Sequence, residues 1–106
     1  MGLDHALYKI IRIDFESVPR EDFWMVANDL TTGELIYWRK KYDIDLWFHQ
    51  NTTIIEEYSD EISKEKLEKF RDWLIENNET EYAERINKII KNNNFVENVI
   101  FYQYSN

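Results

Sequence analysis

The sequence contains no cysteine, which excludes disulfide bonds and cysteine-ligated zinc and is typical of proteins from a reducing cytoplasm. Its two glycines, at positions 2 and 33, lie too far apart to form a phosphate-binding loop, which needs closely spaced glycines. No apolar run approaches the length of a membrane span, and the first residues show no secretory signal pattern. We therefore expect a soluble cytoplasmic protein that does not contact a membrane.

The chain is rich in apolar and acidic residues. Of its 106 residues, 43% are hydrophobic and 16% aromatic, so residues 1–106 are expected to form one domain with its own core. The formal net charge is −8, and an acidic surface repels nucleic-acid phosphates over roughly 10 Å. This balance predicts no direct binding of nucleic acid. It favours either solubility alone or a partner with a basic surface.

The stretch 37–50 contains two of the four tryptophans, one of the two histidines and the only run of three positive charges. Read with 3.6 residues per turn, its large apolar residues fall on one side of a helix. These residues are Tyr37, Ile44, Trp47 and Phe48. The pattern predicts a central helix that ends near Gln50 and on which the core assembles. Residues 34–36 either lead into this helix or belong to it.

Three strands are predicted. Alternating residues indicate a half-buried strand over 7–15, and β-branched residues indicate a second over 52–58. Residues 98–105 are apolar or aromatic on both faces, which predicts a central strand with other elements packed on each side. The residues expected to face the core from the first strand are Leu7, Ile11, Ile13 and Phe15.

A helix is predicted to begin near Ser17, because Pro19 suits a first turn and the two acids that follow suit the positive end of the helix dipole. The apolar stripe that continues it consists of Phe23, Trp24, Ala27 and Leu30. The run 23–26 is equally compatible with a strand. A turn is expected over 28–33, with Gly33 at a position of positive φ.

Two further helices are predicted in the second half of the chain. Ser63 is suited to cap a helix over 64–77, and Thr80 is suited to cap another over 81–92. The second of these helices has acidic and basic residues at the i,i+4 spacing that favours ion pairs. The pairs are Glu81–Arg85 and Glu84–Lys88.

Strands near both ends of the chain, separated by helices, predict an α+β fold. We expect a small antiparallel or mixed sheet of about three strands, covered by three to four helices. No linker, internal repeat or low-complexity segment divides the chain.

Acidic residues are concentrated between positions 56 and 76. Four of them recur at three- and four-residue steps along the predicted helix 64–77 and form one negative stripe. Spaced carboxylates can imitate a phosphate backbone and occupy the basic groove of a protein, although a solvated helix face is the simpler reading. The residues predicted to bind a partner are Glu56, Glu57, Asp60, Glu61, Glu65, Glu68, Asp72 and Glu76.

The run Arg39-Lys40-Lys41 is flanked by aromatic residues and is the one basic and aromatic cluster. Such a cluster can hold an anion or stack on a base. It can equally consist of core aromatics and cations that pair with nearby acids. The alternative ligand site predicted from it comprises Asp4, Trp38, Arg39 and Lys40.

The residue types for metal binding or catalysis are few. A metal site would have to combine the two histidines with carboxylates. The candidates are His5, His49, Asp4, Asp43 and Asp45, of which the last two point in different directions on a helix. Glu56 and Glu57, as neighbours on a strand, would face opposite sides and could not act as an acid–base pair. We therefore expect no enzymatic activity, no metal and no cofactor.

Three segments resemble, in order, a family of small bacteriophage and prophage proteins. They are the start Met1-Gly2-Leu3-Asp4 with Leu7-Tyr8, the run Tyr37-Trp38-Arg39-Lys40 with Ile44 and Trp47-Phe48, and the ending Phe101-Tyr102-Gln103-Tyr104-Ser105. The chain departs from the family at His5, Tyr42 and Asp45, where the family has Met, Asn and His. The resemblance implies a phage origin and carries no activity with it.

These observations lead to three hypotheses. The first is a small acidic phage protein in the cytoplasm of the infected bacterium, which inhibits a host nuclease or other defence complex in the manner of an anti-CRISPR protein. The second is a binder of a small anionic ligand or nucleotide at the alternative ligand site. The third is a homodimeric structural protein. Monomer and homodimer are both compatible with the sequence.

Overall fold

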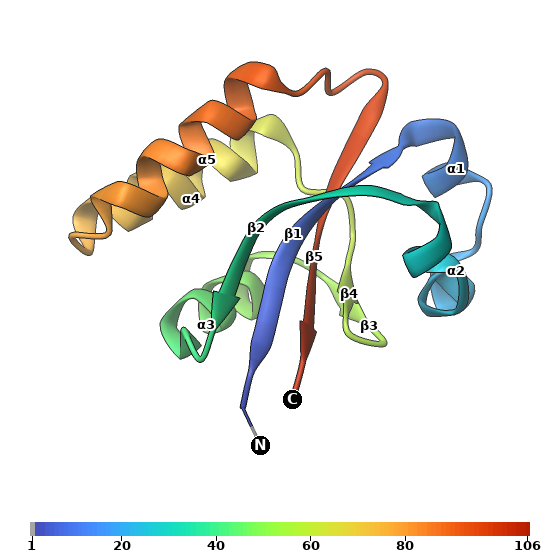
Figure 1. Ribbon diagram of the computed structural model, residues 1–106, viewed down its shortest axis with the longest axis horizontal. Helices are drawn as coiled ribbons and strands as arrows, with labels where there is room; N and C mark the ends of the chain where they lie inside the picture. Colours follow the sequence, from blue (N-terminus) through green and yellow to red (C-terminus); the bar gives the residue numbers. More distant parts are fainter. Residues whose placement is uncertain (1) are drawn as a thin grey trace.

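A five-stranded antiparallel sheet with the order β2-β1-β5-β4-β3 organises the computed structural model, which describes residues 2–106 (Figure 1). The strands are β1 (Asp4–Ile11), β2 (Thr31–Arg39), β3 (Ile54–Ile55), β4 (Tyr58–Ser59) and β5 (Asn98–Ser105). The helices are α1 (Arg12–Glu16), α2 (Phe23–Leu30), α3 (Tyr42–Asn51), α4 (Lys64–Glu76) and α5 (Thr80–Asn92), with a 3-10 turn η1 (Arg20–Asp22). The predicted α+β class is confirmed, and the sheet has more strands than expected.

Helices cover the sheet on both faces and divide the core into two clusters. On one face, α3, α4 and α5 pack against β1, β2 and β5 around Trp38, Phe48 and Phe70. On the other face, α2 packs against Val99 and Phe101 of β5. Apolar side chains on both faces of β5 are therefore explained by its place in the middle of the sheet, as predicted.

The prediction of one helix over 37–50 is wrong in its first part. Tyr37, Trp38 and Arg39 continue β2, where Trp38 pairs with His5 of β1. Lys40 then adopts a positive φ of 58°, and α3 begins only at Tyr42. Aromatic residues favour strands, and the left-handed residue separates strand from helix, so the helical spacing of Tyr37 was coincidental. The buried face predicted for the remainder is confirmed, with Ile44, Trp47 and Phe48 inside.

The first strand also differs from its prediction. It ends at Ile11, and the chain turns into α1. Ile11 is exposed and Ile13 is 77% exposed, so neither faces the core as expected. Leu7 and Ile10 are both fully buried although they point to opposite faces. Because β1 lies between two strands and is covered on both sides, alternation along it could not identify one buried face.

The predicted strand 52–58 is in fact a hairpin of two short strands, β3 and β4. Glu56 and Glu57 form its turn with φ values of 50° and 73°, the conformation that a tight two-residue hairpin turn requires. The expectation that they face opposite sides of a strand is therefore wrong. The turn expected over 28–33 is also absent, because α2 continues to Leu30 and Gly33 lies inside β2 without a positive φ.

The helix predictions fare better. The helical interpretation of residues 23–30 is confirmed, and the alternative strand over 23–26 is wrong. The predicted start near Ser17 is also wrong, because only the 3-10 turn η1 follows Pro19 and α2 begins at Phe23. Ser63 caps α4, since its Oγ accepts a hydrogen bond of 3.1 Å from the backbone N–H of Lys66. Thr80 is not a cap, because it is already the first residue of α5 and Glu79 occupies the capping position. Within residues 2–106, no helix is long and apolar enough to span a bilayer.

Arg12 joins three parts of the fold. Its guanidinium forms a fork with Glu61, with Nη1–Oε1 at 2.9 Å and Nη2–Oε2 at 2.5 Å. It also donates to the backbone carbonyls of Val96 and Phe95, at 2.9 Å and 2.6 Å. The hydrogen bond to Glu61 raises the pKa of Arg12, with a smaller contribution from Glu16. The beginning of α1, the loop before β5 and the segment before α4 are thereby held together.

Replacing Arg12 with glutamine should lower the free energy of unfolding by about 1–2 kcal/mol. Glutamine cannot reproduce the fork or reach all the carbonyls, and the partly exposed site limits the cost of each lost bond. Urea denaturation followed by circular dichroism would measure the change. Lys69→Gln on the exposed face of α4 is a matched control that should shift stability by less than about 0.5 kcal/mol. Equal effects in the two variants would contradict the role of Arg12.

Candidate functional site

Two of the carboxylates predicted to bind a partner are engaged within the molecule. Asp60 lies 2.7 Å from Nε of Arg20, and Glu61 forms the fork with Arg12. Their charges are compensated by cations from distant parts of the sequence. Neither carboxylate is a free negative charge in this molecule, and their part in binding a partner stays a prediction.

The remaining predicted carboxylates do not form one surface. Glu56 and Glu57 stand at the tip of the β3–β4 hairpin, which Figure 1 shows well apart from α4. Along α4, acidic and basic side chains are equally frequent. The acids are Glu65, Glu68, Asp72 and Glu76, and the bases are Lys64, Lys66, Lys69 and Arg71. The stripe exists, but its helix has no net charge.

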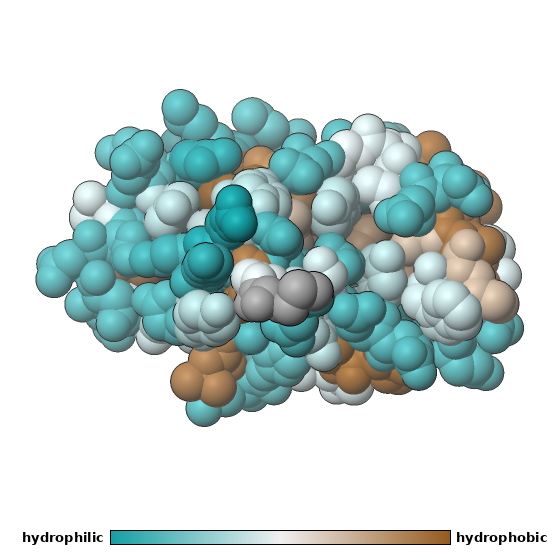
Figure 2. Space-filling view, turned by 60° about the horizontal axis from the view of Figure 1, so that its bottom comes forward, coloured by the Kyte–Doolittle hydropathy of each residue, from teal (hydrophilic) through white to brown (hydrophobic). Residues whose placement is uncertain are grey.

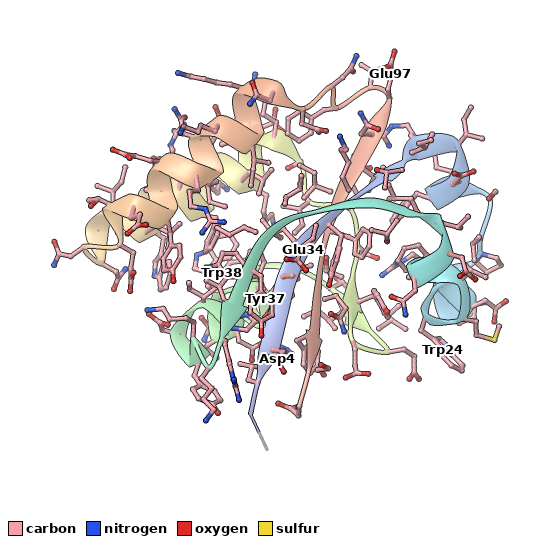
Figure 3. The ribbon with its side chains drawn as sticks, viewed as in Figure 1. Asp4, Trp24, Glu34, Tyr37, Trp38 and Glu97 are labelled. Carbon is pink, nitrogen blue, oxygen red and sulfur yellow. The ribbon has the colours of Figure 1, made fainter. Side chains whose placement is uncertain are left out.

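A different surface combines exposed apolar side chains with negative charge. On α2, Trp24 is 52% exposed and Met25 is 56% exposed. Figure 2 shows apolar residues gathered at the right-hand end of the molecule, where α2 lies, and Figure 3 shows Trp24 projecting from α2 away from the sheet. Helical spacing places Asp29 on the same side of α2 as Met25, and Glu21 and Asp22 are exposed in η1, directly before α2. We call Glu21, Asp22, Trp24, Met25 and Asp29 the α2 surface.

The only cation close in sequence does not neutralise the α2 surface. Arg20 is directed inward, where it pairs with Asp60 and donates to the carbonyl of Tyr58 at 3.1 Å. Its guanidinium carbon also lies over the rings of Phe15 and Phe23, at 5.5 Å and 5.4 Å. Among residues 2–106, none forms an ion pair with the carboxylates of the α2 surface. The surface is therefore both apolar and negatively charged.

The alternative ligand site is brought together only in part. In the strand register, Asp4 of β1 lies opposite Arg39 of β2. The backbone N–H of Lys40 donates to the carbonyl of Leu3. Trp38, however, is buried in the core, where its ring lies 5.9 Å from that of Phe70. It cannot stack on a ligand, so this part of the prediction is wrong.

The carboxylate of Asp4 already has a hydrogen-bond partner within the molecule. Its carboxylate accepts a hydrogen bond from the hydroxyl of Tyr37, and the two side chains lie together in Figure 3. Tyr37, which was expected inside the core, is exposed on the sheet face opposite Trp38. The other two residues of the alternative site, Arg39 and Lys40, are exposed. Neither cation forms an ion pair with any residue in the range 2–106.

The structure contains a buried polar chain that the sequence did not reveal. The hydroxyl of Tyr102 donates to Oδ1 of Asp45 at 2.6 Å and lies 2.8 Å from Nδ1 of His5. Asp45 also lies 3.2 Å from Nε2 of His49, one helical turn further along α3. The chain links β1, β5 and α3 at one end of the sheet. Because the Tyr102 hydroxyl uses its hydrogen to donate to Asp45, its oxygen can only accept from His5, so His5 carries hydrogen on Nδ1.

Burial sets the protonation of this chain. It lowers the pKa of His5 to about 4, outweighing the nearby carboxylates of Asp45, Asp4 and Asp43, which act in the opposite direction. Burial, followed by the hydrogen bond to Asp45, raises the pKa of Tyr102. Both groups are therefore neutral at physiological pH. The Nε2 of His5 and the Nε1 of Trp38 are buried and have no hydrogen-bond partner in the described part of the chain.

The two histidines, which were the candidate metal ligands, lie in different surroundings. Within the described range 2–106, no three His, Asp or Glu side chains converge as a metal site requires. His5 faces the interior from β1, whereas His49 stacks edge-on against Tyr104 at 4.8 Å. The polar chain is placed to fix the packing of β1, β5 and α3 on one another.

Sequence reasoning missed this polar chain because its members come from three distant parts of the sequence. His5 and Tyr102 are 97 positions apart, and only strand pairing brings them together.

Comparison with known proteins gives no further guidance, because no family model, curated protein or solved structure matches this chain.

Proposed function

We propose that this protein binds a partner protein that has a basic surface, and that it does so through the α2 surface. The observation that supports this most directly is the exposure of Trp24 and Met25 among carboxylates that have no cation of their own. A half-exposed tryptophan on a helix has no role in the core. Aromatic residues and methionine are enriched at protein interfaces, and tryptophan is prominent among the residues that contribute most to affinity.

Charge gives this surface a preference for one kind of partner. The chain has a net charge of −8, which accelerates encounter with a positively charged protein and disfavours nucleic acid. Carboxylates around an apolar centre also orient the partner, because misaligned cations lose their pairing. The combination fits a basic groove with an apolar pocket at its floor.

The resemblance to phage proteins supports a partner from the infected cell. Host nucleases and defence complexes hold nucleic acid in basic grooves, and an acidic protein can block such a groove by occupying it. In this proposal the protein acts in the cytoplasm as an inhibitor, as a monomer or as a homodimer. The α4 stripe remains a prediction for a second contact area.

Replacing Trp24 with alanine should weaken partner binding by about 2 kcal/mol or more, a factor of about thirty. The tagged protein would be used to capture partners from a bacterial host lysate at low and at high salt, and affinities would then be measured with the purified partner. Substituting Glu21→Gln, Asp22→Asn and Asp29→Asn together should reduce binding mainly at low salt. Inhibition of the partner's nucleic-acid binding would be tested with the same variants.

The matched control neutralises the α4 stripe with Glu65→Gln, Glu68→Gln, Asp72→Asn and Glu76→Gln. Binding that survives in this variant but is lost in Trp24→Ala supports the α2 surface. The opposite pattern would move the interface to α4. Failure to retain any protein in a salt-sensitive manner, or self-association of the chain through Trp24 on a sizing column, would refute the proposal.

A further inference from the structure

A groove with basic walls lies between the sheet and α5. Its volume is about 360 Å³, near the lower end of the range for small-molecule sites. Lys9 of β1 and Leu35 of β2 line one side, and α5 with the residue that follows it lines the other. The lining residues used below are Lys9, Leu35, Arg85, Lys88, Ile89 and Asn93.

The groove is positively charged although the protein is strongly acidic. Lys9, Arg85 and Lys88 line it, and no carboxylate does. Within residues 2–106, none of these three cations forms an ion pair. The pairs expected from the sequence, Glu81–Arg85 and Glu84–Lys88, do not form. Three cations thus line one groove without a counter-charge.

The helix dipole does not account for these cations. A positive side chain is favoured in the last turn of a helix, and in α5 that position belongs to Lys91. Lys88 and Arg85 lie further from the end of α5, where the effect has fallen off. Lys9 lies on a strand and cannot serve this purpose.

A buried amide gives a second, independent indication of a ligand. Both Nδ2 and Oδ1 of Asn93 are buried, and neither has a hydrogen-bond partner in the described part of the chain. Leaving such a group unpaired is costly, so natural proteins seldom do so without a purpose. Asn93 lines the groove, so its unpaired amide is close to the space in which an anion would bind, although neither amide atom is solvent-exposed.

We propose that this groove binds a small organic phosphate. A phosphate dianion provides several acceptor oxygens for three cations and an amide, and the planar guanidinium of Arg85 suits two-point contact with it. Leu35 and Ile89 offer an apolar wall for the organic part. A small ligand fits the volume, whereas a nucleic acid would meet the negative surface beyond the groove. The site is separate from the α2 surface and goes beyond the proposed function.

Isothermal titration at low salt with phenyl phosphate, inorganic phosphate and benzyl alcohol would test the site. Phenyl phosphate should bind more tightly than phosphate, and the alcohol should not bind. Arg85→Gln and Lys88→Gln should each weaken phenyl phosphate binding about tenfold, the loss expected for one charge-assisted hydrogen bond. Amide resonances of Leu35 and Asn93 should shift on titration.

The matched control is Lys69→Gln, which removes the same charge from the exposed face of α4 and should leave affinity unchanged. Circular dichroism would establish that each variant is folded, as expected for exposed side chains. Equal losses in the control and the groove variants would show that only overall charge matters, and would overturn the proposal. Absence of binding at millimolar concentrations would also overturn it. The binding of phenyl phosphate to the groove does not depend on the α2 surface, so loss of partner capture in Trp24→Ala would leave this test unchanged.

Discussion

Replacing Phe48 with alanine should lower the free energy of unfolding by about 3–5 kcal/mol, the cost of emptying a large aromatic position in a core. Phe48 is fully buried on α3, and its ring stacks on Tyr102 at 4.2 Å. It also lies 4.7 Å from the ring of Phe70 on α4. The single side chain therefore connects two helices to the central strand. Small domains are stable by about 5–15 kcal/mol, so the variant should be close to unfolding.

Urea denaturation followed by tryptophan fluorescence would measure this loss. Leu46→Ala is the matched control, because Leu46 lies on the same helix and is 55% exposed. Its substitution should cost well under 1 kcal/mol. A loss below about 1 kcal/mol for Phe48→Ala would show that the packing around α3 is not the centre of the core.

Acidification should destabilise the protein through His5. The folded state keeps this imidazole neutral down to a pKa of about 4, whereas the unfolded chain takes up a proton near the ordinary value of 6.5. Between these values the unfolded state binds more protons, so lowering the pH favours unfolding. From pH 8 to pH 5 this residue alone should remove about 2 kcal/mol of stability.

His5→Asn tests this assignment. Asparagine can still donate to Tyr102 from the position of Nδ1 but does not titrate, so the dependence of stability on pH above 5 should flatten. Measurements above pH 5 limit the contribution of the carboxylates. An unchanged slope in His5→Asn, or an NMR titration of His5 near 6.5, would contradict the burial argument.

Local sequence patterns predicted the elements that are stabilised by residues close to one another in the sequence. The cap at Ser63 and the apolar stripe of α4 are read from residues within a few positions of one another. The apolar residues on both faces of β5 likewise predicted a central strand. In contrast, Tyr37 had a helical spacing by chance, and only the pairing of its segment with β1 assigned it to a strand.

The predicted sites depended on contacts that no local pattern contains. The acidic residues of 56–76 looked alike in the sequence, yet Asp60 and Glu61 are paired with Arg20 and Arg12. Arg85 and Lys88 had suitable acidic neighbours one helical turn away, yet they line a groove against β1 and β2. Which charges remain unpaired is decided by residues distant in sequence, and so is the exposure of Trp24.

Composition and hydrophobic periodicity were sufficient to predict an acidic chain with a large aromatic core and an α+β fold, because both follow directly from the residues. Where the charges are free and which polar groups meet depends on the folded arrangement of distant segments. Arg12 and Glu61 are 49 positions apart, and Tyr102 and Asp45 are 57 positions apart. Contacts across such distances form only when strand register and helix packing are fixed together, and this requires the whole domain.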